Sequence, residues 1–454
     1  MPQQLLAGAA TSNITPRLGI SINGNLRDGT ALQIHDELHA RCLVLDNGVE
    51  RIGLVVVDSC AVPGEIHEAA KHLVHGNTSF PIDRIIISAT HTHSAPTVTG
   101  VFQSDPDLEY QEFLTLRIAD GLRRAINNLR PARVAWAVGS EPTQVFNRRW
   151  KKRPGTIPAD PFGGTSDLVQ MNPSRGSDDL LEPSGPIDPD VTLLSVQDAH
   201  GKPLALFANY SLHYVGDVGP GHVSADYFAA FSDRMQQLLQ ADRLDPPFVA
   251  MMSNGTSGNI NNVNFRVAGG AATPPYTRIK SVAYTVADAA FQALQSAEYH
   301  DWVPIAMREA RLTLGRRLPA PAEVDRAKFI LEQAKPGPLA TLEEAYARET
   351  YIMADLPPTI ETVIQAARIG ELGIVTLPCE TFVETGLAIK AASPFKPTLA
   401  ISLANDYAGY LPTVEHHRLG GYETWRARSS FLEVEAEPKI RGKLLEMLAE
   451  VERG

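Results

Sequence analysis

The chain has 454 residues, of which 44% are hydrophobic and 20% are charged, and its formal net charge at pH 7 is −11. This composition is typical of a globular protein that can bury a large core, and it excludes a disordered chain. The acidic balance argues against nucleic acid as a partner, because phosphate binding needs a basic surface.

The three cysteines are too few for a disulfide framework. No stretch approaches the roughly 20 apolar residues of a membrane helix, which predicts no integral membrane segment. The first residues lack the basic region and the long apolar run of a secretion signal. Together these features predict a cytoplasmic protein.

Short apolar runs rich in β-branched residues predict buried strands. They cover residues 41–45, 52–57, 84–88, 191–196, 204–208, 248–252, 373–377 and 398–403. Longer segments with helical periodicity predict helices over residues 110–129, 226–239, 321–333, 342–354 and 439–451. The alternation of the two kinds predicts the α/β class, with a mixed β-sheet core flanked by helices.

The segment from residue 149 to 189 is different, because it is rich in Pro, Gly, Ser and Asp and has no apolar period. It predicts a long surface insertion that lies over the active site. The candidate chemical residues are spread from His91 to Tyr422. One site that draws on such distant segments predicts a single catalytic domain over residues 1–454.

The strongest local motif is a predicted strand that runs directly into His91-Thr92-His93 and ends at Pro96. In extended backbone the two histidines point to the same side. Imidazole is the commonest zinc ligand, and a catalytic zinc site needs about three protein ligands and an open position. Two structural histidines that bond to backbone are an equally good interpretation of this motif alone.

Three further predicted strands end in polar clusters, which contain His213, Ser253 and Glu380. Each has an ordinary interpretation of its own: a structural histidine, a turn, and a glutamate paired with an arginine. In open α/β sheets, however, ligands bind beyond the carboxyl ends of the strands. Four such ends with His, His, Ser and Glu therefore predict one composite site.

Further motifs extend this pattern along the chain in a fixed order. They are residues 7–16 (AGAATSNITP), 91–96 (HTHSAP), 147–148 (NR), 213 (H), 224–226 (SAD), 253–254 (SN), 377–380 (LPCE), 405–413 (NDYAGYLPT) and 421–423 (GYE). With this ordered set the chain resembles the neutral/alkaline (non-lysosomal) ceramidase family over most of its length.

The resemblance implies a zinc site and assigns residues to it. The zinc ligands that it implies are His91, His213, Glu380 and Tyr410. The residues that it implies around the substrate and the reacting bond are His93, Arg148, Ser253 and Tyr422. Ser257 competes with Ser253, because the turn that follows Ser253 is one residue longer here than in the family.

Two departures from the family put ceramide itself in doubt. The turn has Gly258-Asn259 where the family has an acidic residue, and residues 149–189 have no counterpart. We therefore expect a zinc-dependent hydrolase that cleaves an amide (N-acyl) bond by metal-activated water, with a small polar N-acyl or O-acyl compound as its substrate. The alternatives are a metal-dependent esterase, lactonase or phosphoesterase, and a non-catalytic binding homologue.

The segment His35-Asp36-Glu37-Leu38-His39 also has the composition of a metal cluster. It comes just before the predicted strand at residues 41–45. Because short motif matches have a high false-positive rate, we expect a structural role for Asp36 instead.

Overall fold

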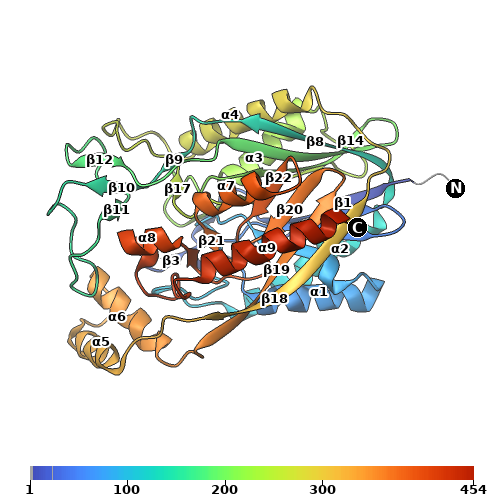
Figure 1. Cartoon of the computed structure of the whole chain (residues 1–454). Coiled ribbons are helices and arrows are strands. Elements are labelled where there is room, and N and C mark those ends of the chain that lie inside the picture. Colours follow the sequence, from blue (N-terminus) through green and yellow to red (C-terminus); the bar gives the residue numbers. More distant parts are fainter. Residues whose placement is uncertain (1–3, 23, 454) are drawn as a thin grey trace.

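Two β-sheets packed face to face form the centre of the computed structural model, which describes residues 4–22 and 24–453 (Figure 1). The larger sheet has the order β16 (Val249–Asn254), β14 (Pro203–Tyr210), β13 (Asp190–Asp198), β8 (Arg130–Ser140), β1 (Leu6–Asn13), β5 (His39–Asp46), β6 (Arg51–Val57) and β7 (Ile85–Ala89). The smaller sheet has the order β18 (Ile305–Gly315), β19 (Thr359–Ile369), β20 (Leu372–Thr376) and β22 (Thr398–Ile401).

Both sheets are mixed. Most neighbouring strands are antiparallel, whereas β14 and β16, β6 and β7, and β20 and β22 are parallel pairs. The predicted mixed-sheet α/β core is therefore confirmed, although the predicted strands are divided between two sheets.

Helices cover the outer face of each sheet and complete four layers (Figure 1). The larger sheet carries α1 (Gly64–Thr78), α2 (Leu108–Asn127), α3 (Asp226–Leu238) and α4 (Thr277–Leu294). The smaller sheet carries α7 (Val383–Ala392) and α9 (Ala436–Arg453).

The side-chain alternation of β5 shows why the core takes this form. Cys42 and Val44 pack toward the helices, whereas Leu43 and Leu45 pack toward the other sheet. Successive side chains of a strand point to opposite faces, so a strand covered on both faces is a continuous apolar run. The predicted strands are runs of this kind.

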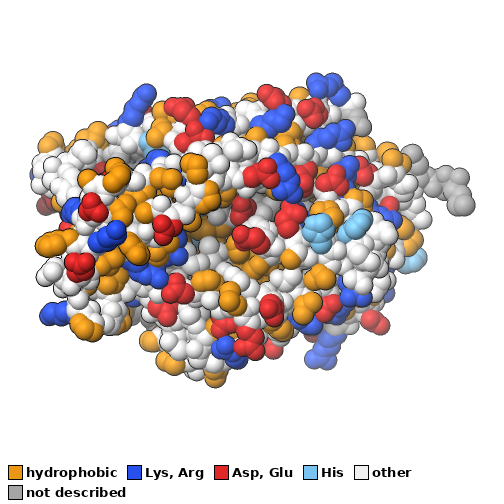
Figure 2. All heavy atoms as spheres, turned by 90° about the horizontal axis from the view of Figure 1, so that it is seen from below, with side chains coloured by type: hydrophobic (Ala, Val, Ile, Leu, Met, Phe, Trp, Pro, Cys, Tyr) orange, Lys and Arg blue, Asp and Glu red, His pale blue; other side chains and the backbone are white. Residues whose placement is uncertain are grey.

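The insertion at residues 149–189 contains a small sheet of its own, in the order β11 (Val169–Met171), β10 (Arg149–Lys152) and β12 (Leu180–Pro183). A hairpin of α5 (Pro321–Gln333) and α6 (Leu342–Met353) lies at the same end of the molecule, opposite the C-terminus of α9 (Figure 1). Seen from below, many hydrophobic side chains gather at this end (Figure 2).

The remaining elements are short. They are the strand pairs β2 (Ser21–Ile22) with β3 (Gly29–Thr30), β4 (Gln33–Ile34) with β15 (His222–Val223), β9 (Phe146–Asn147) with β17 (Ile260–Asn261) and β21 (Glu380–Thr381) with β23 (Tyr410–Leu411), the helix α8 (Val414–Leu419), and the 3₁₀ helices η1 (Ile82–Arg84) and η2 (Tyr422–Thr424). Within residues 4–22 and 24–453, every helix is too short or too polar to cross a bilayer.

Candidate metal centre and active site

The carboxyl ends of three core strands converge on one point. His91 follows β7 by two residues, His213 follows β14 by three, and Glu380 follows β20 by four. The two sheets are joined here, because Ser402 donates from its backbone N–H to the carbonyl of Asn254, at 3.0 Å. Three of the four strand ends from which a composite site was predicted therefore meet here, and they belong to both sheets.

The ligand atoms of this group lie within reach of a single ion. The Nε2 atoms of His91 and His213 are 3.1 Å apart, and Glu380 Oε2 lies 3.2 Å from the first and 3.8 Å from the second. All three side chains are buried.

Both imidazoles are held in the tautomer that a metal ligand requires. His91 Nδ1 donates to the carbonyl oxygen of Cys60 at 2.6 Å, and His213 Nδ1 donates to that of Ser257 at 3.1 Å. A carbonyl only accepts, so both protons are on Nδ1, and both neutral rings present an Nε2 lone pair to the centre. Glu380 Oε2 is buried and has no hydrogen-bond donor. Three converging acceptors with no donor between them fit a bound cation.

The pKa shifts of the residues at the centre also indicate that this position favours a positive charge. Burial lowers the pKa of His91, but the negative charge of Glu380 outweighs burial and holds that pKa well above its usual range. Burial would raise the pKa of Glu380, yet His91 reverses the effect and lowers it. Burial, with the positive charge of Arg148, holds the pKa of His213 well below its usual range. Without a metal, a proton on His91 takes the place of the cation.

The backbone conformation of His91 differs from the extended conformation that was predicted for it. Its φ is +74°, in the left-handed region, so the extended backbone assumed for the His91-Thr92-His93 motif is wrong at its first residue. The two rings nonetheless converge, with their Nε2 atoms 3.2 Å apart. Strained backbone of this kind persists where surrounding contacts fix it, and here the N–H of His91 donates to the carbonyl of Ser59.

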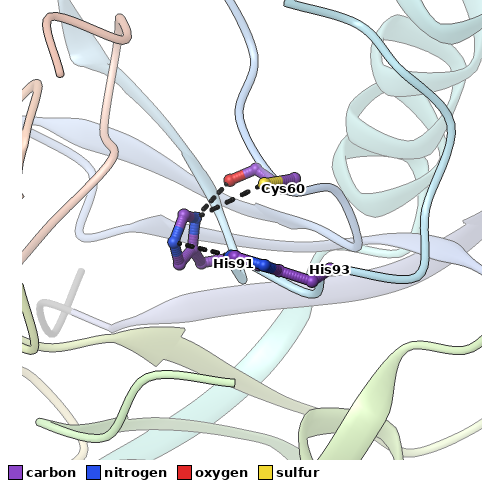
Figure 3. Close-up of side chains that lie close together, drawn as sticks. All are labelled: Cys60, His91 and His93. Atoms are coloured by element: carbon purple, nitrogen blue, oxygen red, sulfur yellow. Dashed lines mark hydrogen bonds between the residues drawn. The ribbon is translucent and has the colours of Figure 1, made fainter. Parts of the chain in front are cut away.

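A second possible metal group overlaps the first. Cys60, His91 and His93 also lie close enough to hold an ion (Figure 3). The Cys60 Sγ is 3.8 Å from His91 Nδ1, on the side of the ring that already donates to the Cys60 carbonyl. Because that nitrogen is occupied, the group of His91, His213 and Glu380 is the better metal site.

Tyr410 lies beside Glu380 because β21 and β23 pair in parallel with these two residues in register. Burial, reinforced by the charge of Glu380, raises the pKa of Tyr410 well above its usual range. Its hydroxyl accepts a hydrogen bond from Arg148 Nη2 at 3.0 Å. Arg148 is itself buried and is held by Glu423, whose Oε1 lies 3.2 Å from its Nε.

The centre opens into a small cavity, which His93 and Tyr422 line together with Glu380 and Tyr410. Burial and the positive charge of His91 hold the pKa of His93 well below its usual range. The structure thus brings the predicted residues His91, His93, His213, Glu380, Tyr410, Tyr422 and Arg148 into one region.

Ser253 is not among the residues that the structure brings together here, and its predicted role toward the substrate stays a prediction. It lies inside β16, fully buried, and its hydroxyl accepts from Asn209 and donates to the carbonyl of Ala208. The hydroxyl of its competitor Ser257 donates to Asn254, and only the carbonyl of Ser257 reaches His213.

Asp36 has the structural role expected for it. It accepts from the Ser224 hydroxyl at 2.6 Å and from the Ala225 backbone N–H at 2.7 Å. It therefore fixes the entry to α3 and takes no part in the metal centre.

Two aromatic residues at the site were not predicted from the sequence. The Tyr407 hydroxyl donates to Glu380 Oε1 at 3.0 Å, which leaves Oε2 to face the histidines. The ring of Tyr214 stacks on that of His93, with centroids 3.6 Å apart. Two signals in the sequence could have found them: Tyr407 lies within the motif at residues 405–413, and Tyr214 directly follows the predicted ligand His213.

Comparisons with known proteins agree with this architecture. The chain matches the crystal structure of neutral ceramidase from Pseudomonas aeruginosa with a TM-score of 0.73 and 18% identity, over 100% of this chain and 75% of that one. It matches a structure described as ceramidase complexed with C2 with a TM-score of 0.72 and 17% identity, over 99% of this chain and 76% of that one. The chain therefore has the neutral ceramidase fold, and the resemblance predicted from the ordered motifs is confirmed.

Among curated proteins, neutral ceramidase A of Dictyostelium discoideum is 22% identical over 270 residues. The matched region is 54% of this chain and 33% of that protein, so the chain matches about a third of its length. A search against models of protein families finds no match.

Proposed function

We propose that this protein is a zinc-dependent hydrolase that cleaves the amide bond of an N-acyl compound. The observation that supports this most strongly is the convergence of two Nε2 lone pairs and one donor-free carboxylate oxygen at a buried point. Two imidazoles and a carboxylate, with an open position beside them, are a ligand set typical of catalytic zinc.

His91, His213 and Glu380 would hold the metal, with Tyr410 beside them. Bound zinc supplies a nucleophile at neutral pH, by lowering the pKa of water toward about 7, and it polarises a carbonyl group. Every other contribution comes from side chains of the chain itself.

His93 and Tyr422 are the groups that would act on the substrate. Both line the cavity, and His93 Nε2 lies 3.2 Å from His91 Nε2, next to the position of the metal. His93 can take a proton there and deliver it to the leaving amine. The Tyr422 hydroxyl can donate to the carbonyl oxygen as negative charge develops on it. Arg148 would act indirectly, because it donates a hydrogen bond to the hydroxyl of Tyr410.

The proposed substrate is a small N-acyl compound, with O-acyl compounds as the competing class, and the proposed compartment is the cytoplasm. Cys42, Cys60 and Cys379 are all free and buried, which supports a reducing environment.

The test is turnover of matched amide and ester pairs by one pure preparation, first freed of metal with a chelator and then supplied with zinc. We expect amide hydrolysis that is absent from the metal-free protein and returns with zinc. Turnover of the esters but not of the amides would show that the protein is an esterase and not an amidase. Zinc binding without any turnover would point to a binding homologue.

A further inference from the structure

The cavity beside the metal centre is small. Its volume is about 30 Å³, whereas pockets for drug-sized ligands measure about 300–1,000 Å³. A single water needs roughly 10–15 Å³ on the same measure. The other residues that line the cavity include Val101, Phe102 and Ala61.

Val101 and Phe102 form a wall that is packed from behind. They belong to a tight turn in which Val101 and Ser104 exchange backbone hydrogen bonds, at 3.2 and 3.0 Å. Phe102 has a φ of +52°, which a bulky side chain rarely adopts. Its ring lies 5.5 Å from that of Tyr346 on α6, in an apolar cluster that includes Ala427.

Charged hydrogen bonds lock this wall in place. The carbonyl of Phe102 accepts from both Arg348 and Arg428. Arg428 also forms a bidentate pair with the fully buried carboxylate of Glu349, at 2.7–3.2 Å. Pairs of this kind fix geometry, because removing either partner leaves a buried charge alone. The wall is therefore part of the packed core, unlike a mobile loop.

We propose that this wall restricts the acyl group of the substrate to acetyl or propionyl size, and that Phe102 is the residue that sets the limit. The substrate class in this proposal rests on the proposed amidase function. The size limit rests only on the packing of the wall. A longer acyl chain has no space unless Phe102 moves, and overpacking of a rigid wall is strongly unfavourable.

The test uses straight-chain hydroxamates, which bind zinc whether or not the protein cleaves amides. Affinities of acetohydroxamate, butyrohydroxamate, hexanohydroxamate and octanohydroxamate are measured by calorimetry on the zinc-loaded protein. We expect acetohydroxamate to bind at least about tenfold more tightly than octanohydroxamate. Phe102→Ala should remove or reverse this preference. Phe102→Leu keeps most of the packing and serves if the alanine variant does not fold, and it should admit butyrohydroxamate.

The matched control is Phe329→Ala, because Phe329 is 64% exposed on the neighbouring helix α5 and should leave the chain-length profile unchanged. Affinity that rises with every added methylene in the wild type would overturn the proposal, since it indicates an open apolar channel. Failure of all four hydroxamates to bind would also overturn it. Lack of amide turnover, with the short-chain preference intact, would instead contradict only the proposed function.

Discussion

His91 Nε2 and His213 Nε2 lie 3.1 Å apart, with a buried carboxylate oxygen beside them. When neither nitrogen carries a proton, like partial charges at this distance repel, and burial makes the repulsion stronger because the local dielectric is low. A cation between them turns that repulsion into the strongest attraction at the site. The same positions that would destabilise an empty core therefore favour a metal.

The roles of His91 and His93 can be separated by substitution. We expect His91→Ala to lose the metal, because His91 Nε2 is one of the converging atoms. His93→Ala should keep the metal but lose turnover by about 10²–10⁴-fold, the range typical of a lost proton-transfer group. Metal content and kcat/KM measured on both variants check this. Equal loss of metal from the two variants would show that the separate roles assigned to His91 and His93 are wrong.

Glu423 is a second residue with a large expected effect. It is fully buried between two arginines, with Oε1 3.2 Å from Arg148 Nε and Oε2 2.6 Å from Arg149 Nη1. Glu423→Gln leaves both guanidinium groups without a counter-charge, which should lower the free energy of unfolding by about 3–5 kcal/mol. Urea unfolding measures this.

The control for Glu423 is Glu182→Gln in the insertion. Glu182 pairs with Lys151 on the surface, where the pair is exposed on both sides, so no measurable loss of stability is expected. If Glu423→Gln is equally mild, the arginines are held by other contacts and the buried pair has no structural importance.

At the scale of elements, the turn between β16 and β17 supports the strand that carries Glu380. Gly258 donates to the carbonyl of Thr381, and a Cβ built on Gly258 would lie 2.5 Å from the carbonyl oxygen of Glu380. Gly258→Ala must therefore displace β21. We expect zinc affinity to fall by about 10–100-fold, as for other changes in groups that support metal ligands.

The matched control is Gly269→Ala, in the loop between β17 and α4, because no atom lies within 4 Å of the added methyl group there. Zinc affinity measured by competition with a chelator should be unchanged there. A Gly258→Ala protein with full affinity would mean that β21 adjusts without moving Glu380.

The sequence predicts the elements of this fold unevenly. Strands buried on both faces, such as β6 and β7, were predicted to within a residue, because they are unbroken apolar runs. The long strands β18 and β19 were not predicted. Part of each is exposed, and their charged side chains interrupt the apolar pattern. Helix α1 was also missed, because its segment contains Gly, Asn, Thr and three histidines, which are weak helix formers.

The sequence predicts the residues of the site unevenly as well. His91, His213 and Glu380 could be predicted because each follows an apolar strand and because the ordered motifs match a known family. Ser253 lies within β16 and bonds inside the sheet, and register accounts for this placement, since one residue decides whether a side chain of a strand faces the site or the interior of the sheet. Tyr407 and Tyr214 act through contacts with other side chains, which a sequence pattern does not reveal.

At the scale of the whole molecule, buried histidines should make stability depend on pH. Burial lowers the pKa of His67 to about 3, that of His416 to about 3 and that of His417 to about 4. In the unfolded chain the pKa is about 6.5, so below that pH the unfolded state binds more protons than the folded state. Stability should therefore fall as pH decreases from about 6.5 toward 4, by at most about 1.4 kcal/mol per pH unit for each histidine.

His67→Gln should reduce this slope, and His72→Gln provides the control, because His72 is on the same helix but its side chain is 65% exposed. Urea unfolding of metal-free protein between pH 4.5 and 7 separates this effect from metal binding. A slope that is unchanged by His67→Gln would show that this histidine is already protonated in the folded state.

The central claim is that His91, His213 and Glu380 hold one metal ion. Its most direct test is an anomalous difference map, measured at the zinc absorption edge from crystals grown with zinc. We predict a single strong peak in contact with His91 Nε2, His213 Nε2 and Glu380 Oε2. A map without a peak at this point, or with its peak between Cys60 and His93 instead, would contradict the account.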